Sequence, residues 1–556
     1  MLLFSSGEKI GYRGRPADSV ATRQLQPRQP ARERSGGHQP LPASGWLSVC
    51  PDRSQRLVLG VSVVALLVMG AALRCFEYDE TYTHALSAGL FPPDWPLAPF
   101  LAGEARAWFD TAPSHPWRIV TDLIRYDTHP PLYFWLVLVW RALFGPDPLV
   151  IRLLSVLLTL GSAAVFWRLA LVAKVPPLPA VACAFLAYAM LYTGVIARAY
   201  PLALLLLLIG TLLLASVLRE AADGPRRGHA ARAAAAGLAF GLAILCHYLA
   251  ALTAGLLLAG FGMTMLAWRR WPPAIAAGLG LMPPLLAALL IRRNQGSADW
   301  HLAGFDWGLA IVSIARGQTA ALFGGTPLYV EGAGAQLALI VLVAAALLLL
   351  AGAILLALPA ILADPVRRVM LLAAVGGPLT LLALGWATER SPFEFRYFVF
   401  GVPYVALSFA AGLGALGARR PRLAAVIGAY VLAWQFVGAA AMPFAQETQQ
   451  DYRVAVRAAE PYMRAGAALL VPIAADGIGM NGPFVWEAPA DWTLRVIRPN
   501  EPPEAVLAQL GNRPRLVLTT MADGVGREAI RALRPALEAA GWRPRPVGPF
   551  VEVWER

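Results

Sequence analysis

Eleven apolar runs recur along the chain, each about long enough to cross a hydrocarbon core of roughly 30 Å as a helix. They lie at residues 57–74, 151–172, 177–196, 199–218, 233–249, 250–268, 272–291, 335–358, 369–388, 397–417 and 423–441. Of the 556 residues, 58% are hydrophobic and only 15% are charged, against about 25% charged in soluble domains. We therefore expect a polytopic α-helical membrane protein.

The net charge of +13 comes largely from basic clusters between the apolar runs. These clusters are Arg168 with Lys174, Arg226 with Arg227 and Arg232, Arg269 with Arg270, Arg367 with Arg368, and Arg419 with Arg420 and Arg422. A cytoplasmic N-terminus places all five clusters on the cytoplasmic side, as the positive-inside rule requires. The C-terminus is then extracytoplasmic. Because the charge marks orientation and does not line one face, nucleic-acid binding is not expected.

The segment 131–144 is apolar but only about fourteen residues long, and it contains Arg141. If it crossed the membrane fully, every later basic cluster would change sides. We expect a helix at the membrane interface, with Tyr133, Trp135 and Trp140 among the lipid headgroups. A full twelfth span is the alternative.

Three domains are expected along the chain. Residues 1–56 carry nine Lys or Arg against four Asp or Glu, which predicts a disordered basic cytoplasmic tail. Residues 57–441 form the transmembrane domain, with 75–131 as its first extracytoplasmic loop. In residues 442–556, short apolar segments alternate with amphipathic helices, which predicts a small extracytoplasmic α/β domain.

The loop 75–131 places carboxylates next to the membrane. Asp79 and Glu80 follow Arg74 at the outer end of the first run. Consecutive helical residues point about 100° apart, so both are not expected to face one pocket. Further along, Asp127-Thr128-His129 precedes two prolines, whose fixed φ angles hold the preceding side chains rigidly. The alternatives are a solvated helix start for the acidic pair and a helix cap for Asp127.

This order of motifs resembles the first extracytoplasmic loop of membrane glycosyltransferases of the GT-C class. The nearest resemblance, over residues 57–420, is to the family 39-like branch, which includes protein mannosyltransferases and aminoarabinose transferases. It implies transfer of a sugar from a polyprenyl-phosphate donor in the lipid bilayer to an extracytoplasmic glycan, lipid or protein. It also implies that Asp79 is the catalytic base, with Glu80 and Asp127 as further catalytic candidates. Asp79 and Asp127 could together hold a divalent cation, Mg²⁺ or Mn²⁺.

Later segments supply candidates for binding the substrate. Arg198 lies between two apolar runs, where an unpaired guanidinium costs roughly 2.5–3.5 kcal/mol, and a phosphate would be a fitting bidentate partner. Each candidate has an alternative role. Arg198 could extend its side chain to the outer membrane interface, His247 could be a hydrogen-bonded structural residue, and Arg396 could anchor the topology of its helix. The family commonly has a glutamate two residues before Arg198, where this chain has Ile196. The full set of substrate-binding candidates is His129, Arg198, Tyr200, His247, Tyr248, Arg396 and Tyr397.

Two other functions stay open. A transporter or lipid flippase predicts internal repeats and polar residues within the spans, and neither stands out in the sequence. A non-catalytic scaffold of the same fold is the second, because of Ile196. The loop 297–334, with Trp300, His301, Trp307, Phe323 and Tyr329, is expected to form either an acceptor wall or an aromatic belt at the interface.

Overall fold

A computed structural model describes most of the chain. The described residues are 52–224, 226–295, 304–325, 332–443, 452–479, 481–511, 513–548 and 550–556. The predictions for the N-terminal tail before residue 52 and for Trp300, His301 and Tyr329 therefore lie outside the described residues.

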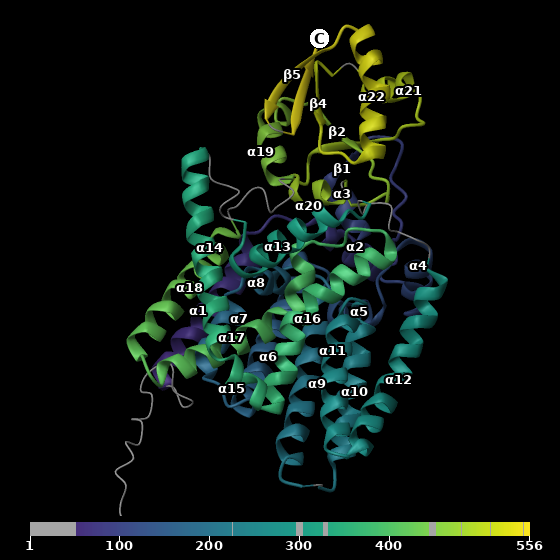
Figure 1. The fold of residues 1–556 in the computed structure, drawn as a ribbon. Helices are drawn as coiled ribbons and strands as arrows, with labels where there is room; N and C mark the ends of the chain where they lie inside the picture. The colour runs from purple at the N-terminus through teal and green to yellow at the C-terminus, as the bar shows by residue number, and fades with distance from the viewer. Residues whose placement is uncertain are drawn as a thin grey trace, which may run out of the picture. The chain divides into compact units, whose positions relative to one another are not determined.

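All eleven apolar runs are helical (Figure 1). Eight described helices are long and apolar enough to cross a membrane: α1 (Arg53–Leu73), α6 (Pro148–Val172), α9 (Tyr200–Ala221), α11 (Ala250–Ala267), α12 (Trp271–Asn294), α14 (Ala333–Leu356), α16 (Pro365–Thr388) and α18 (Pro421–Ala441). One run is broken into α7 (Pro177–Phe185) and α8 (Tyr188–Val195), which meet at a bend of 61°. The two shorter helices are α10 (His229–Ile244) and α17 (Val402–Gly417). The chain is a multi-pass membrane protein.

Small residues bring the membrane helices into backbone contact. A Cβ added at Gly237 of α10 would lie 1.9 Å from the carbonyl oxygen of Ala277 in α12. A Cβ at Gly280 would lie 2.0 Å from that of Ala234. Close packing of this kind replaces the hydrophobic driving force, which is absent between helices in lipid.

The segment 131–144 forms the short helix α5 (Leu132–Phe144), and its placement at the membrane interface stays a prediction. Its Arg141 is buried and donates through Nη1 to the carbonyl oxygen of His84 and to Ser87 Oγ. The segment 297–334 contains α13 (Trp307–Phe323), which Asp306 caps, a helix that the sequence analysis did not identify. Arg316 and Gly317 interrupt the apolar pattern there, which hid the helix from the sequence analysis.

The C-terminal region folds as an α/β domain around one sheet, with the strand order β1-β3-β2-β4-β6-β5 (Figure 1). Its strands are β2 (Ala468–Pro472), β3 (Thr493–Ile497), β4 (Arg515–Thr519), β5 (Arg543–Gly548) and β6 (Val551–Glu555). Its helices are α19 (Tyr452–Met463), α20 (Gly482–Glu487), α21 (Pro503–Leu510) and α22 (Gly524–Ala539). Strand β2 is parallel to both neighbours, as connections through helices require.

The sixth strand of this sheet comes from the first loop. Strand β1 (Phe100–Leu101) pairs antiparallel with β3, and α3 (Ala102–Trp108) and α4 (Trp117–Tyr126) follow it. The prediction that the α/β domain is confined to residues 442–556 misses this strand, because two residues carry no sequence period. The loop 75–131 therefore belongs to the sheet as well as to the membrane domain.

Candidate functional site

Helix α2 (Tyr78–Ala88) places Asp79 in its first turn. The helix start is fixed by Glu80, whose Oε2 accepts a hydrogen bond of 3.0 Å from the amide of Glu77. The Asp79 carboxylate is almost entirely buried and forms an ion pair with Arg396 Nη1. Its Oδ1 lies 4.0 Å from Arg198 Nη2. Two guanidiniums from distant segments thus converge on one carboxylate.

A hydrogen-bonded chain joins Arg198 to Asp127. Arg198 Nη1 donates to the main-chain oxygen of Asp79 at 3.1 Å, and its Nη2 lies 3.0 Å from His129 Nε2. Since a guanidinium can only donate, Nε2 accepts. His129 therefore carries its proton on Nδ1 and donates it to Asp127 Oδ1 at 2.7 Å. Asp127, His129 and Arg198 act as one polar unit beside Asp79.

Aromatic rings pack around His247, next to the polar unit. The His247 ring packs 4.7 Å from the Tyr200 ring, 5.7 Å from that of His129 and 6.3 Å from that of Tyr397. These three neighbours come from α9, the first loop and the 3-10 helix η3 (Phe395–Phe400). His247, Tyr200 and Tyr397 therefore form an aromatic group that contacts the polar unit through His129.

Two residues that the sequence analysis missed support the cluster. Gln295 Nε2 donates to the main-chain oxygen of His129 at 3.0 Å, and its Oε1 accepts from the Tyr248 hydroxyl at 3.0 Å. Tyr248 therefore acts through Gln295 and does not contact Asp79 directly. Glu394 holds the far side of Arg396 by an ion pair of 2.6 Å. The only sequence feature that points to Glu394 is its place two residues before Arg396, at the start of η3.

Glu80 does not join this cluster. Its fully buried carboxylate pairs with Arg152 of α6, which donates from Nε at 2.8 Å and also from Nη2. Its Oε1 also accepts from the Ala197 amide at 2.9 Å. All these contacts are structural, so the geometry does not support the catalytic prediction for Glu80. The reason is the divergence of consecutive helical side chains.

The charges of the site follow from burial and neighbours. Burial alone would raise the pKa of Asp79, but Arg396 and Arg198 outweigh it and bring that pKa below its ordinary value. Burial likewise opposes ionisation of Asp127, and His129 with Arg198 again brings the pKa down. At neutral pH the site therefore holds two carboxylates.

Three buried polar atoms of the site have no hydrogen-bond partner among the described residues. They are Asp127 Oδ2, His247 Nε2 and Arg396 Nε. A buried acceptor or donor without a partner costs roughly 1–3 kcal/mol. All three atoms are therefore suited to bind polar groups of a ligand.

A metal ion fits these residues poorly. In the described part of the chain, no three His, Cys, Asp or Glu side chains form a group that could hold an ion. Asp79 faces two guanidiniums, and Asp127 Oδ1 faces His129. Divalent cations of the Mg²⁺ type need several free oxygen ligands. The sequence-based prediction that Asp79 and Asp127 hold Mg²⁺ or Mn²⁺ stays untested.

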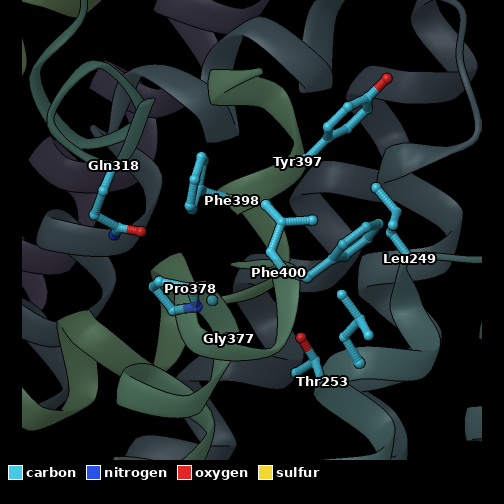
Figure 2. A pocket seen from close by; sticks show the side chains of 11 residues that line it. Leu249, Thr253, Gln318, Gly377, Pro378, Tyr397, Phe398 and Phe400 are labelled. Carbon is cyan, nitrogen blue, oxygen red and sulfur yellow. The ribbon is translucent and has the colours of Figure 1, made fainter. Parts of the chain in front are cut away.

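An apolar pocket adjoins the cluster (Figure 2). It lies between α11, α13, α16 and η3, and its wall includes Leu249, Thr253, Gln318, Pro378 and Phe400. Tyr397 lines it too, and the guanidinium carbon of Arg396 lies 5.7 Å from the centre of that ring. One ring therefore borders both the apolar pocket and Arg396.

No protein-family model matches the chain, and no curated protein matches it.

Comparison of structures gives the fold, which is that of the GT-C class of membrane glycosyltransferases, as the sequence resemblance predicted. ArnT from Cupriavidus metallidurans bound to undecaprenyl phosphate is similar with a TM-score of 0.50 and 13% identity, over 90% of this chain and 98% of that chain. The apo state of ArnT gives 0.48 and 14% identity, over the same shares. The arabinofuranosyltransferase AftD from Mycobacteria gives 0.45 and 16% identity, over 93% of this chain and 40% of that chain.

Proposed function

We propose that this protein is a membrane glycosyltransferase that moves a sugar from a polyprenyl-phosphate donor to an extracytoplasmic glycan, lipid or protein. The observation that carries the proposal is the buried Asp79 carboxylate held between Arg198 and Arg396. The basic clusters between the apolar runs support a cytoplasmic N-terminus and an extracytoplasmic C-terminus, in the inner or plasma membrane.

The two arginines provide the phosphate site. A phosphate monoester or diester offers several acceptor oxygens in the geometry that guanidinium forks prefer. Arg396 Nε has no partner among the described residues, so this arginine has a donor to spare. In the absence of ligand, Asp79 supplies the negative charge that the two guanidiniums need.

In this proposal the start of the isoprenoid chain packs against the apolar residues around the pocket that Tyr397 lines (Figure 2). Hydrocarbon burial there and phosphate binding at Arg396 would favour the same orientation of the lipid. The undecaprenyl phosphate bound in the similar ArnT structure supports a donor of this class.

Donor binding also makes Asp79 a stronger base. Paired with Arg396, the Asp79 carboxylate binds protons weakly, since a nearby cation favours its charged form. When Arg396 turns to the donor phosphate, this effect weakens and the pKa of Asp79 rises towards its ordinary value. Asp79 then accepts the proton of an acceptor hydroxyl more readily, so the donor binds before the acceptor reacts.

Transfer proceeds by direct displacement. The acceptor oxygen forms a bond to the anomeric carbon while its proton passes to Asp79. The bond from that carbon to the phosphate oxygen breaks, and the leaving phosphate keeps the electron pair. Arg198 and Arg396 stabilise the charge that develops on it. One displacement inverts the anomeric configuration. Asp127 Oδ2 accepts a hydrogen bond from a sugar hydroxyl. His247 Nδ1 accepts the Leu249 amide, so its Nε2 donates a hydrogen bond to another sugar hydroxyl.

The test is binding of undecaprenyl phosphate to the purified full-length protein in nanodiscs. Arg198→Ala and Arg396→Ala should each weaken binding by about tenfold or more, since a hydrogen bond to a charged group contributes roughly 1.5–3 kcal/mol. Arg125→Ala is the matched control, because Arg125 is exposed on α4 in the same loop region. Equal binding by all four proteins would overturn the phosphate site.

A further inference from the structure

A turn of the C-terminal α/β domain packs against α2, the helix that carries Asp79. Tyr78 and Tyr82 lie one helical turn apart on α2, and both hydroxyls donate to Oδ2 of Asp476. The other carboxylate oxygen, Oδ1, accepts from the amides of Ile478 and Gly479 at 2.9 and 2.8 Å. One aspartate therefore joins its own turn to two tyrosines that flank Asp79.

The contact has little free space. A Cβ added at Gly479 would lie 2.0 Å from Cε2 of Tyr78, and one at Gly482 would lie 2.1 Å from Cγ2 of Thr81. Such distances require the neighbouring atoms to shift. The turn thus lies directly against α2, and only glycine allows the approach.

Tyr82 also faces Arg198, one of the two phosphate-binding arginines. The guanidinium carbon of Arg198 lies 5.8 Å from the centre of the Tyr82 ring, within cation–π range. Burial, and then Asp476, raises the pKa of both Tyr78 and Tyr82, so their hydroxyls stay protonated donors. The path from the α/β domain to the site therefore runs from Asp476 through Tyr82 to Arg198.

A second set of contacts holds residues 73–76, which lead into α2. Arg453 Nη1 donates to the main-chain oxygen of Leu73 at 2.6 Å, and its Nε donates to Glu487 Oε2 at 2.8 Å. Glu487 Oε1 in turn accepts the amide of Phe76. Arg453 and Glu487 fix where α2 begins, whereas Asp476 fixes its rotation about its own axis.

Rotation of α2 decides where the Asp79 carboxylate lies. The carboxylate stands about 6 Å from the helix axis, so a turn of roughly 20° moves it by about 2 Å. A misplacement of about 1 Å can cost around 10²-fold in rate. We propose that Asp476 is a positioning residue of the transfer reaction, through which the α/β domain sets the geometry of Asp79. The inference rests on the proposed role of Asp79 as the base.

The test compares Asp476→Asn with Asp523→Asn in the full-length protein. Asp523 belongs to the same domain, caps α22 and accepts the Ala475 amide at 2.7 Å, but it has no described contact with α2. With undecaprenyl-phosphate mannose and undecaprenyl-phosphate aminoarabinose as donor probes, Asp476→Asn should lower kcat about 10- to 100-fold. Binding of undecaprenyl phosphate should stay within about threefold, and Asp523→Asn should retain kcat within the same margin. An equal loss in both variants, or a loss of lipid binding in proportion to kcat, would reduce Asp476 to a folding role and overturn the proposal.

The tyrosine variant keeps the proposal testable if Asp476→Asn folds poorly. Tyr78→Phe with Tyr82→Phe keeps both rings, removes both donors to Asp476 and should by itself lower kcat about 10- to 100-fold. Where Asp476→Asn folds, the triple variant should be no slower than the tyrosine double variant, because Asp476 acts through these hydroxyls. Additive losses would contradict the mechanism.

Hydrogen exchange separates this inference from the proposed function, because it needs no activity. The amides of residues 78–88 should exchange faster in Asp476→Asn, while those of α6 stay unchanged. Unchanged exchange in α2 would overturn the contact. A wild-type protein that transfers no sugar from any probe, yet shows the faster exchange, would instead contradict the proposed function and leave the contact standing.

Discussion

The adjacent carboxylates of α2 should differ in what their mutation changes: Asp79 chiefly the transfer rate, and Glu80 chiefly the stability of the fold. Glu80→Gln tests the effect on stability. Glu80 is fully buried, and its two oxygens accept from Arg152, from the Ala197 amide and from the Glu77 amide. Glutamine has nearly the same shape, but it has no charge and places an amide donor against groups that also donate. Arg152 then loses its only anionic partner among the described residues.

The size of the effect follows from these contacts. Removing one partner of a buried ion pair costs about 3–5 kcal/mol. Arg152 also donates to the main-chain oxygens of Ala71, Arg74 and Cys75 at 2.8–3.0 Å, which places the loss near the lower end. The entropy of unfolding is about 2.1 cal/mol/K per residue, which gives a Tm lower by roughly 3 °C for a chain of this length.

The assay is tryptophan-fluorescence unfolding of the purified protein in one detergent, at one heating rate. Asp79→Asn is the matched control, because Arg396 keeps its ion pair with Glu394 and Arg198 keeps His129. Its Tm should fall less than that of Glu80→Gln. If Glu80→Gln unfolds at the wild-type temperature and Asp79→Asn does not, the two roles have been assigned the wrong way round.

Three further outcomes are expected. Arg396→Lys should recover only part of the undecaprenyl phosphate binding that Arg396→Ala loses, because an ammonium lacks the guanidinium fork; full recovery would indicate a simple charge. Chelation by EDTA should leave donor binding and transfer within about twofold, since both carboxylates already face cationic or hydrogen-bonding side chains; a loss that Mg²⁺ or Mn²⁺ restores would show that Asp79 and Asp127 hold a metal. The pKa of Asp79 is below its ordinary 3.8, so its stabilising effect is complete above that value and is lost as the pH falls through the lowered pKa. The Tm difference between wild type and Asp79→Asn should therefore be constant over roughly pH 5 to 8 and shrink below about pH 4, and a difference that already shrinks between pH 7 and pH 5 would contradict the lowered pKa.

The membrane helices could be predicted from the sequence because hydrophobic length alone determines them. The break between α7 and α8 could not, since the run 177–196 is uniformly apolar. Helix α13 was missed because Arg316 and Gly317 lower its hydropathy.

Much of the candidate site was also accessible from local motifs. Asp79, Asp127, His129, Arg198 and Arg396 each stand next to a membrane run or a proline turn, and the structure brings them together. The partners that fix them are not visible in the sequence. Asp476 lies almost 400 positions from Tyr78, and Gln295 lies 166 positions from His129, so no local pattern joins them. Arg152 shows the same limit, because nothing near it in the chain indicates that Glu80 is its partner.

The central claim is that Asp79 takes the proton of the acceptor at a site where two arginines hold the donor phosphate. The most direct measurement is single-turnover transfer from a radiolabelled polyprenyl-phosphate sugar by wild type and Asp79→Asn, with undecaprenyl phosphate binding measured on the same samples. Loss of a general base should lower the transfer rate by about 10²–10⁴-fold while lipid binding persists. Transfer by Asp79→Asn within about threefold of wild type would contradict the account.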